Sequence, residues 1–347
     1  MVKRISFKAY RWLIIPLLLL VVTSLQAQRN AKYAGEFLSL GVGARYSGLG
    51  GAGVAISNDV TAGYFNPSNL STLKFPQISV FHEPRFAGLF NYDYAAGALP
   101  IDEKQTAGLT ILRFGYGEIK DTRNALIDRN GNGIIDEEDR VDPNRIRIGS
   151  AADWAFVGSY ARAINKKLSV GGNVKLLYRA ILATSAWGFG IDIGASYKAR
   201  DHLTLGVTLY DATKSLLAWE TGHQEFIVPS LRLGAAYNLD ITDDHSVRPT
   251  LDGIYRFEGR EEATTVDAGL FSLDIAAGIE YGYKNKVFAR GGYSELGQLS
   301  LGAGVKLPKL NIDYSFTQEN GNLDNIGVTH RVSLMLTLEE DKFLRGS

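Results

Sequence analysis

Twelve residues from Asp128 to Asp139 have the types and spacing of a metal-binding loop. Counted from Asp128, oxygen-bearing side chains stand at positions 1, 3, 5, 9 and 12, and a glycine stands at position 6. EF-hand calcium loops have this pattern, with the backbone carbonyl of position 7 as a further ligand. The predicted Ca²⁺ ligands are Asp128, Asn130, Asn132, Ile134 (through its carbonyl), Asp136 and Asp139.

Two departures from the EF-hand pattern indicate a weak, loop-only site. Asp139 has a shorter arm than the bidentate glutamate usual at position 12, and Pro143 stops an exiting helix early. We expect an affinity on the order of 0.1–1 mM, as in extracellular modules, and a structural role in ordering the surrounding loop. The alternative is a solvated turn, rich in Asn and Gly, that binds no ion.

Other chemistry is poorly represented in the chain. There is no cysteine, which excludes a cysteine nucleophile and thiolate metal ligands, and the five histidines are scattered. No G-x-S-x-G, H-E-x-x-H or P-loop motif occurs. Residues 48–53 formally match G-x-G-x-x-G, but a dinucleotide site needs a parallel sheet around it. We therefore expect neither enzymatic activity nor an organic cofactor.

Lys+Arg and Asp+Glu both number 37, so no basic excess indicates a nucleic-acid partner.

The first 27 residues predict a cleaved secretory signal peptide. Positive residues precede an apolar stretch from Trp12 to Val22, and small and polar residues follow up to Ala27. The apolar core is shorter than the roughly 20 residues that span a bilayer, and it contains Pro16. The chain is therefore expected to be exported, with residues 1–27 removed.

After residue 76 the chain alternates between apolar and small or polar side chains with a period of two, as in strands with one apolar face. Many of these segments are longer than the 5–6 residues usual in soluble proteins, and aromatic residues often lie near their ends, as in the girdles of outer-membrane barrels. We count about fourteen: 77–82, 91–99, 105–114, 153–163, 167–179, 187–198, 202–211, 227–238, 246–257, 270–283, 286–294, 297–306, 309–317 and 328–338.

The predicted fold class is therefore all-β, a transmembrane antiparallel β-barrel of about 14 strands over residues 77–338. Residues 115–152 form its longest external loop, which contains the calcium motif, and residues 339–347 form a C-terminal tail. The expected location is the outer membrane of a Gram-negative-type cell. A soluble β-sandwich is the alternative. The face that would line the lumen has charges of both signs, which indicates a lumen largely filled by salt bridges.

Four short motifs precede the first predicted strand. They are Leu-Gly-Val-Gly-Ala-Arg at 40–45, Gly-Leu-Gly-Gly-Ala-Gly at 48–53, Asn-Asp-Val-Thr-Ala at 58–62 and Tyr-Phe-Asn-Pro-Ser-Asn-Leu at 64–70. This segment resembles the N-terminal signature of the PorV/PorQ-like outer-membrane proteins, relatives of the FadL-type hydrophobic-compound transporters. The strand count also agrees with the FadL type. The chain departs from the signature at Ser68–Asn69, where the family usually has Ala-Gly.

The resemblance implies that residues 28–76 fold inside or under the barrel as a hatch. Glycines permit tight turns in a narrow lumen, and Asn-Pro favours a fixed turn. The alternative is a Gly-rich first hairpin with no ligand role. The predicted hatch motif consists of Gly48, Gly50, Gly51, Gly53, Asn66 and Pro67.

Two functions follow from the resemblance. The first is that of the PorV branch, a type IX secretion shuttle whose external loops capture exported proteins at the cell surface. The alternative is FadL-type transport of hydrophobic small molecules past the hatch. The expected partners are outer-membrane lipid and either exported proteins or other secretion components, or else hydrophobic small molecules.

The connection at 211–226 offers a candidate contact for such a ligand or partner. It contains the apolar residues Leu216, Leu217 and Trp219 amid polar neighbours, and it could fold as a short helix. In FadL-type relatives an external loop helps to form a hydrophobic groove. The alternative is that these three side chains cap the barrel mouth or dip into lipid.

Overall fold

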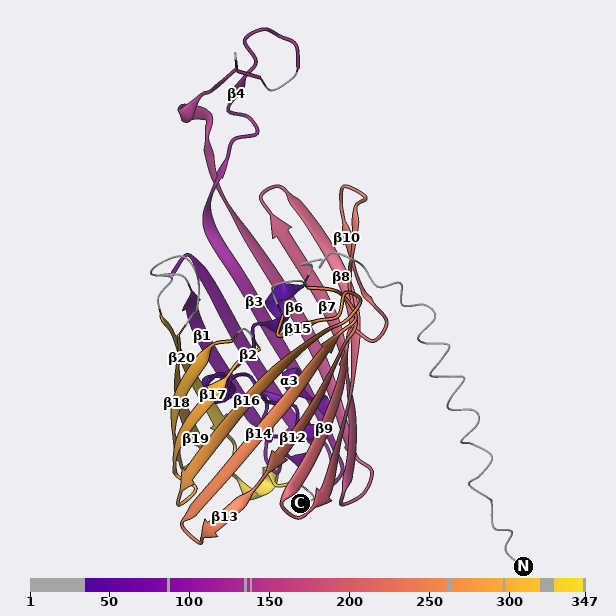
Figure 1. Cartoon of the computed structure of the whole chain (residues 1–347), viewed down its shortest axis with the longest axis vertical. Coiled ribbons are helices and arrows are strands. Elements are labelled where there is room, and N and C mark those ends of the chain that lie inside the picture. The colour runs from indigo at the N-terminus through magenta and orange to yellow at the C-terminus, as the bar shows by residue number, and fades with distance from the viewer. Residues whose placement is uncertain are drawn as a thin grey trace, which may run out of the picture.

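The computed structural model describes residues 35–85, 88–133, 136–137, 139–260, 264–295, 297–318 and 328–345. Fourteen antiparallel strands form a closed barrel, because β1 (Gln77–Arg85) pairs with both β2 (Phe90–Pro100) and β20 (Val328–Thr337) (Figure 1). The predicted fold class is confirmed. The predicted signal peptide and Ile134 lie outside the described residues.

The wall between β2 and β20 follows chain order, with each strand antiparallel to the next. Its strands are β3 (Gln105–Asp121), β6 (Arg147–Ala163), β7 (Leu168–Ile181), β8 (Thr184–Arg200), β9 (Leu203–Tyr210), β12 (Ser230–Tyr237), β14 (His245–Arg256), β16 (Ser272–Tyr283), β17 (Val287–Tyr293), β18 (Leu299–Leu307) and β19 (Leu310–Gln318). Shorter strands β13 (Leu239–Thr242) and β15 (Val266–Asp267) extend individual hairpins.

Each long strand has an apolar outer face and a small or polar inner face. In β8 the outward Trp187, Phe189 and Ile193 are 51–56% exposed, whereas the inward Asp192 is 2% exposed. A soluble β-sandwich would have its large apolar residues inside, so this reversed pattern excludes that alternative. It fits a barrel with a lipid-facing surface and an outer-membrane location. Among the described residues, none of the helices has the length and apolar character needed to cross a membrane.

The two ends of the barrel differ. At the end that we call the loop end, β3 and β6 continue far beyond the neighbouring strands as a projecting hairpin (Figure 1). Strands β4 (Leu126–Ile127) and β5 (Arg140–Val141) and the 3₁₀ turn η4 (Pro143–Arg145) lie near its tip. At the opposite, turn end the connections are short, and the C-terminal 3₁₀ turn η5 (Asp341–Phe343) follows β20.

The segments predicted for β3 and β6 are therefore too short, since β3 runs on to Asp121 and β6 begins at Arg147. These extensions have polar side chains on both faces, so no alternation marks them in the sequence. The expected short helix at 211–226 is wrong. That segment forms a hairpin of β10 (Ser215–Trp219) and β11 (Gln224–Ile227), because the long β8 leaves a free edge above β9 with which β10 pairs.

Candidate functional site

Residues 36–72 lie in the barrel lumen, and we call this segment the hatch (indigo in Figure 1). It consists of η1 (Glu36–Ser39), α2 (Ala44–Ser47), α3 (Ala62–Phe65) and η2 (Pro67–Thr72). Helix α2 contacts β18, β19 and β20, whereas η2 contacts β3, β6, β7 and β8 on another part of the wall. The hatch therefore crosses the lumen, and its side chains Tyr46, Leu49, Phe65 and Leu70 are buried in the centre.

Glycines in the wall let the hatch backbone lie directly against the strands. A Cβ atom on Gly278 would stand 2.6 Å from the Leu49 carbonyl oxygen, and one on Gly206 would stand 2.5 Å from that of Val54. On Gly292 the added atom would collide with the backbone of Leu49 and Gly50. Real Cβ atoms do not approach other atoms this closely, so these positions exclude any larger residue while the hatch is in place.

The predicted hatch glycines shape the turn that reaches this wall. Gly50 and Gly51 have φ of 66° and 84°, in the left-handed region that favours glycine. Gly53 donates its backbone N–H to the buried Asp252 carboxylate at 2.8 Å, and Gly48 packs against Gly302 of β18.

Asn66 and Pro67 begin η2. The Asn66 side chain is fully buried, and its Oδ1 accepts a hydrogen bond from the Ser68 hydroxyl at 2.7 Å. Its Nδ2 donates to the carbonyls of Val54 and Ala195, each at 3.1 Å, so one amide joins two parts of the hatch to β8. Pro67 occupies the first position of η2, where its missing N–H costs nothing.

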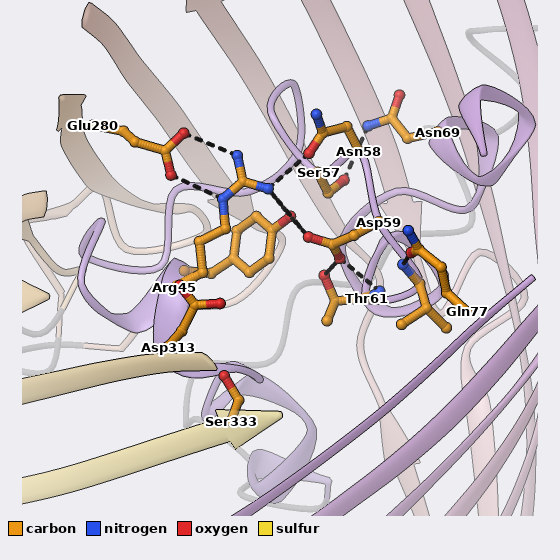
Figure 2. A network of polar contacts seen from close by, with 12 residues as sticks. Arg45, Ser57, Asn58, Asp59, Thr61, Asn69, Gln77, Glu280, Asp313 and Ser333 are labelled. Carbon is orange, nitrogen blue, oxygen red and sulfur yellow. Dashed lines mark hydrogen bonds and ion pairs between the residues drawn. The ribbon is translucent and has the colours of Figure 1, made fainter. Parts of the chain in front are cut away.

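An ion-pair network fastens the hatch to the wall near the turn end (Figure 2). Arg45 of α2 donates to both Glu280 carboxylate oxygens of β16, at 2.9 and 3.0 Å. It also donates to Asn58 at 2.7 Å and to Asp59 at 3.2 Å, and the Tyr46 hydroxyl donates to Asp59 at 2.7 Å. Arg45 therefore joins two segments of the hatch to one carboxylate of the barrel.

Glu280 in turn accepts from two arginines of the wall. Arg290 donates to it at 2.7 Å and Arg248 at 3.2 Å, and Arg290 also donates to Asp313 at 2.6 Å. Such mutual compensation of buried charges is what the mixed-sign inner face predicted. The sequence motif at 40–45 includes Arg45, but only the closed barrel shows that its partner lies 235 residues away.

Three cavities flank the hatch. Two, of about 110 and 150 Å³, lie towards the loop end on either side of η1 and share Glu36, Arg232, Arg260 and Glu295. The third, of about 170 Å³, lies towards the turn end and surrounds the Arg45 network. The hatch thus separates cavities at the two ends of the lumen, and each is large enough for a small molecule.

Tyr64 of α3 holds the first turn of the hatch beside the 110 Å³ cavity. Its hydroxyl donates to the Leu38 carbonyl and accepts from the Gly41 N–H at 3.0 Å. Burial raises the pKa of Tyr64 to about 12, because the phenolate would be poorly solvated there.

The described part of the predicted calcium loop forms a turn held by side-chain hydrogen bonds. The Asp128 carboxylate accepts from backbone amides three and five residues further on, at 2.6 and 2.8 Å. The Asp136 carboxylate accepts from the side-chain amides of Asn130 and Asn132, each at 2.8 Å. The Asp139 carboxylate accepts from the amide of Asp136 at 3.2 Å. Within the described ranges no three or more Asp, Glu or His side chains are grouped to hold a metal ion, and the calcium site stays a prediction.

The three predicted contact residues of the 211–226 connection all lie on β10, but they are not equivalent. Leu217 is 3% exposed and belongs to the buried core, whereas Leu216 is half-buried. The Trp219 indole donates to Glu225 of β11 at 2.8 Å. These contacts show how the hairpin is held; its predicted role as a ligand or partner contact is untested.

The fold of the chain is similar to the folds of solved toluene transporters and a hydrocarbon channel. It is similar to the toluene transporter TbuX of Ralstonia pickettii (TM-score 0.53, 13% identity, covering 86% of this chain and 97% of that one). It is also similar to the toluene transporter TodX of Pseudomonas putida (0.55, 13%, 86% and 99%) and to the monoaromatic hydrocarbon channel CymD (0.54, 14%, 87% and 98%). At these identities the likeness shows the fold alone. No family model and no curated protein matches the chain.

Proposed function

We propose that this protein is an outer-membrane barrel that transports small hydrophobic molecules past its hatch. The observation that carries the proposal is the arrangement of the lumen. A segment of the same chain crosses the lumen, and cavities of ligand size lie against that segment on its loop-end side. A purely structural barrel would need no such occupied but hollow passage.

Two further observations support the proposal. The toluene transporters named above share the closed barrel over nearly their whole length. The outward face of the strands is apolar, as an outer-membrane location requires. These neighbours are transporters or channels rather than enzymes, in agreement with the expectation of no catalytic activity.

Uptake of radiolabelled toluene tests the proposal. Intact cells that carry the full-length protein in their outer membrane should accumulate toluene faster than cells with an empty vector. Equal initial rates, with the protein shown to be present and folded in the outer membrane, would contradict it. The matched control is the same protein with the β3–β6 hairpin shortened at its tip, which lies outside the barrel and should leave uptake unchanged.

The secretion-shuttle function remains a second prediction. It rests on the resemblance of residues 38–73 to the PorV/PorQ signature, and no comparison bears on exported proteins. Co-purification from the outer membrane in mild detergent would test it, since a shuttle should carry exported cargo in amounts close to its own.

A further inference from the structure

The partition between one loop-end cavity and the turn-end cavity is a single helical turn. Helix α2 has four residues, and its Ser47 lines the loop-end cavity of about 150 Å³ whereas its Arg45 lines the turn-end cavity of about 170 Å³. Residues two apart on a helix point in nearly opposite directions, since each residue turns the chain by about 100°. The two cavities therefore lie on opposite sides of the same helical turn.

The barrel wall against which α2 packs is lined by small residues. Strands β18, β19 and β20 contact this helix, and each of them lines both cavities. Between the two cavities the inner-face residues of these strands are Gly302, Gly304, Ser315 and Ser333. A Cβ atom on Gly48, which ends α2, would stand 3.0 Å from the Cα of Gly302. Small residues thus let α2 lie close to the wall, but they offer little side-chain surface to hold it there.

Two hydroxyl groups in this region have no hydrogen-bond partner among the described residues. They are Oγ of Ser47 on α2 and Oγ of Ser315 on β19, and the two residues are 8% and 0% exposed. A buried hydroxyl that makes no hydrogen bond raises the free energy of the arrangement that buries it. Water or a polar group that entered between α2 and the wall would satisfy both hydroxyls, which favours separation of the two surfaces.

Polar attachment of α2 to these three strands is sparse. In the described part of the chain a single hydrogen bond joins them, from the Ala44 N–H to the Ser333 hydroxyl at 3.1 Å. The Arg45 ion pair does not add to this attachment, because its partner Glu280 belongs to β16. Movement of α2 away from β18–β20 therefore breaks one hydrogen bond and little side-chain packing.

The other side of the hatch is attached to the wall by many more bonds. Among the described residues, five side-chain hydrogen bonds of 2.6–3.1 Å join α3 and η2 to strands β7, β8 and β9. The bonded pairs are Gly63–Asn173, Phe65–Thr208, Phe65–Tyr210, Asn66–Ala195 and Ser71–Ser169. The backbones are also in direct contact, since a Cβ atom on Gly171 of β7 would stand 2.6 Å from the amide nitrogen of Ser68. Separation on this side would break all five bonds.

We propose that the route through the barrel passes between α2 and strands β18–β20, and that Gly302, Ser315 and Ser333 set the size of the molecule that passes. The inference rests on the proposed transport function and deepens it, because it assigns the passage and its narrowest point. The cavity of about 150 Å³ is the last site before this passage, and a cavity of roughly this volume holds one benzene ring. The route therefore suits compact molecules of a single ring, which reach the turn-end cavity when α2 moves away from the wall.

Reversible cross-links test this route, because the chain has no cysteine of its own. The double variant Ala44→Cys/Ser333→Cys replaces two residues that share a hydrogen bond, and its disulfide ties α2 to β20. In planar bilayers the oxidised full-length protein should lose its open events, which should return on reduction. Equal frequencies of open events before and after reduction, with the disulfide shown by mass spectrometry, would overturn the route.

A second cross-link is the matched control. In Ser71→Cys/Ser169→Cys the two replaced hydroxyl groups lie 2.8 Å apart, and the disulfide ties η2 to β7. This variant should keep its open events when oxidised, because η2 stays in place while α2 moves. Loss of open events in both oxidised variants would show that the hatch moves as a whole, and would also overturn the route.

Two single substitutions test the same route without a disulfide, and they decide if the Ala44–Ser333 cross-link does not form. Ser333→Ala removes the hydrogen bond between α2 and the wall and should raise the frequency of open events severalfold. Ser169→Ala removes a hydrogen bond of η2 and should leave that frequency unchanged. Equal frequencies in the two variants would overturn the route.

Conductance and uptake distinguish this inference from the proposed function. Open events that the Ala44–Ser333 cross-link abolishes, without any barrel-dependent uptake of toluene, would contradict the proposed function alone. Toluene uptake that persists at the wild-type rate in the oxidised Ala44→Cys/Ser333→Cys variant would contradict only the route.

Discussion

Arg45 of the hatch and Glu280 of the barrel wall are joined by two hydrogen bonds, from Nε at 2.9 Å and from Nη2 at 3.0 Å. Their side chains are 15% and 4% exposed. Because Glu280 also accepts from Arg248 and Arg290, this one carboxylate ties the hatch to the ion pairs of the wall. The position of the hatch is therefore coupled to the charge balance of the lumen near its turn end.

Arg45→Met should loosen the hatch without abolishing the barrel. Removal of one partner from a buried ion pair costs about 3 kcal/mol, since the other charge loses its compensation. We expect a lower free energy of unfolding in urea and more frequent open events in planar bilayers. Lys284→Gln is the control, because that lysine pairs with Asp244 at 3.6 Å on the exposed surface and should change neither measurement. Wild-type behaviour of Arg45→Met would show that the network does not hold the hatch.

Two adjacent glycines of β17 give a matched pair of variants. Gly292→Ala places a methyl group against the backbone of Leu49 and Gly50, whereas at Gly291 the nearest atoms are 3.9 and 4.0 Å away. Gly292→Ala should therefore displace the hatch and raise bilayer conductance, and Gly291→Ala should leave it unchanged. Both variants must first be shown to form folded barrels, by their gel shift on boiling. Equal conductance of two folded variants would contradict direct packing of the hatch backbone against the wall at Gly292.

Deletion of residues 30–60 tests the hatch as a plug. The strands pair without it, so the barrel should assemble, but the lumen loses the side chains of Tyr46 and Leu49 and the network around Arg45. Conductance in planar bilayers and sensitivity of cells to detergent should both rise. Replacement of Asn66 and Pro67 should have a weaker effect in the same direction. An assembled deletion variant that conducts no more than the wild type would exclude the plug function.

Calcium should order the tip of the β3–β6 hairpin if the predicted loop binds the ion. At millimolar Ca²⁺ the region between Asp121 and Arg147 should resist protease, and chelator should remove that resistance. Asp128→Ala should abolish the difference, whereas Asp142→Ala, outside the motif, should retain it. Identical digestion with calcium and with chelator would leave the solvated turn as the correct interpretation.

Tyr64 should make the hatch sensitive to alkaline pH. Its folded pKa of about 12 lies above the unfolded value of about 10, so the folded state binds the proton more tightly. The resulting stability is complete below pH 10 and is lost as the pH rises through 12, by about 3 kcal/mol. Between pH 10 and 12, the free energy of unfolding of Tyr64→Phe should therefore fall less steeply than that of the wild type. Parallel pH profiles of the two proteins would exclude this contribution.

Much of the barrel could be predicted from residue order alone. Alternation such as that of Trp187, Phe189 and Ile193 with the polar or small residues between them has the period of a strand, and every member of the pattern is a near neighbour in the chain. Strand number and the polarity of each face follow from such local patterns. The extensions of β3 and β6 and the β10–β11 hairpin differ from the sequence prediction, because strands can pair without the regular apolar alternation by which a strand is recognised in a sequence.

The contacts that make a functional site depend instead on closure of the barrel. Arg45 and Glu280 are 235 residues apart, Arg331 and Glu83 are 248 apart, and no local periodicity relates the members of either pair. In the sequence, nothing distinguishes Gly292 from the other small residues of the inner face. Only the folded chain brings Gly50 against it. Chain order sets which side of each strand faces inwards, whereas the register and curvature of the closed sheet set which inward residues meet across the lumen.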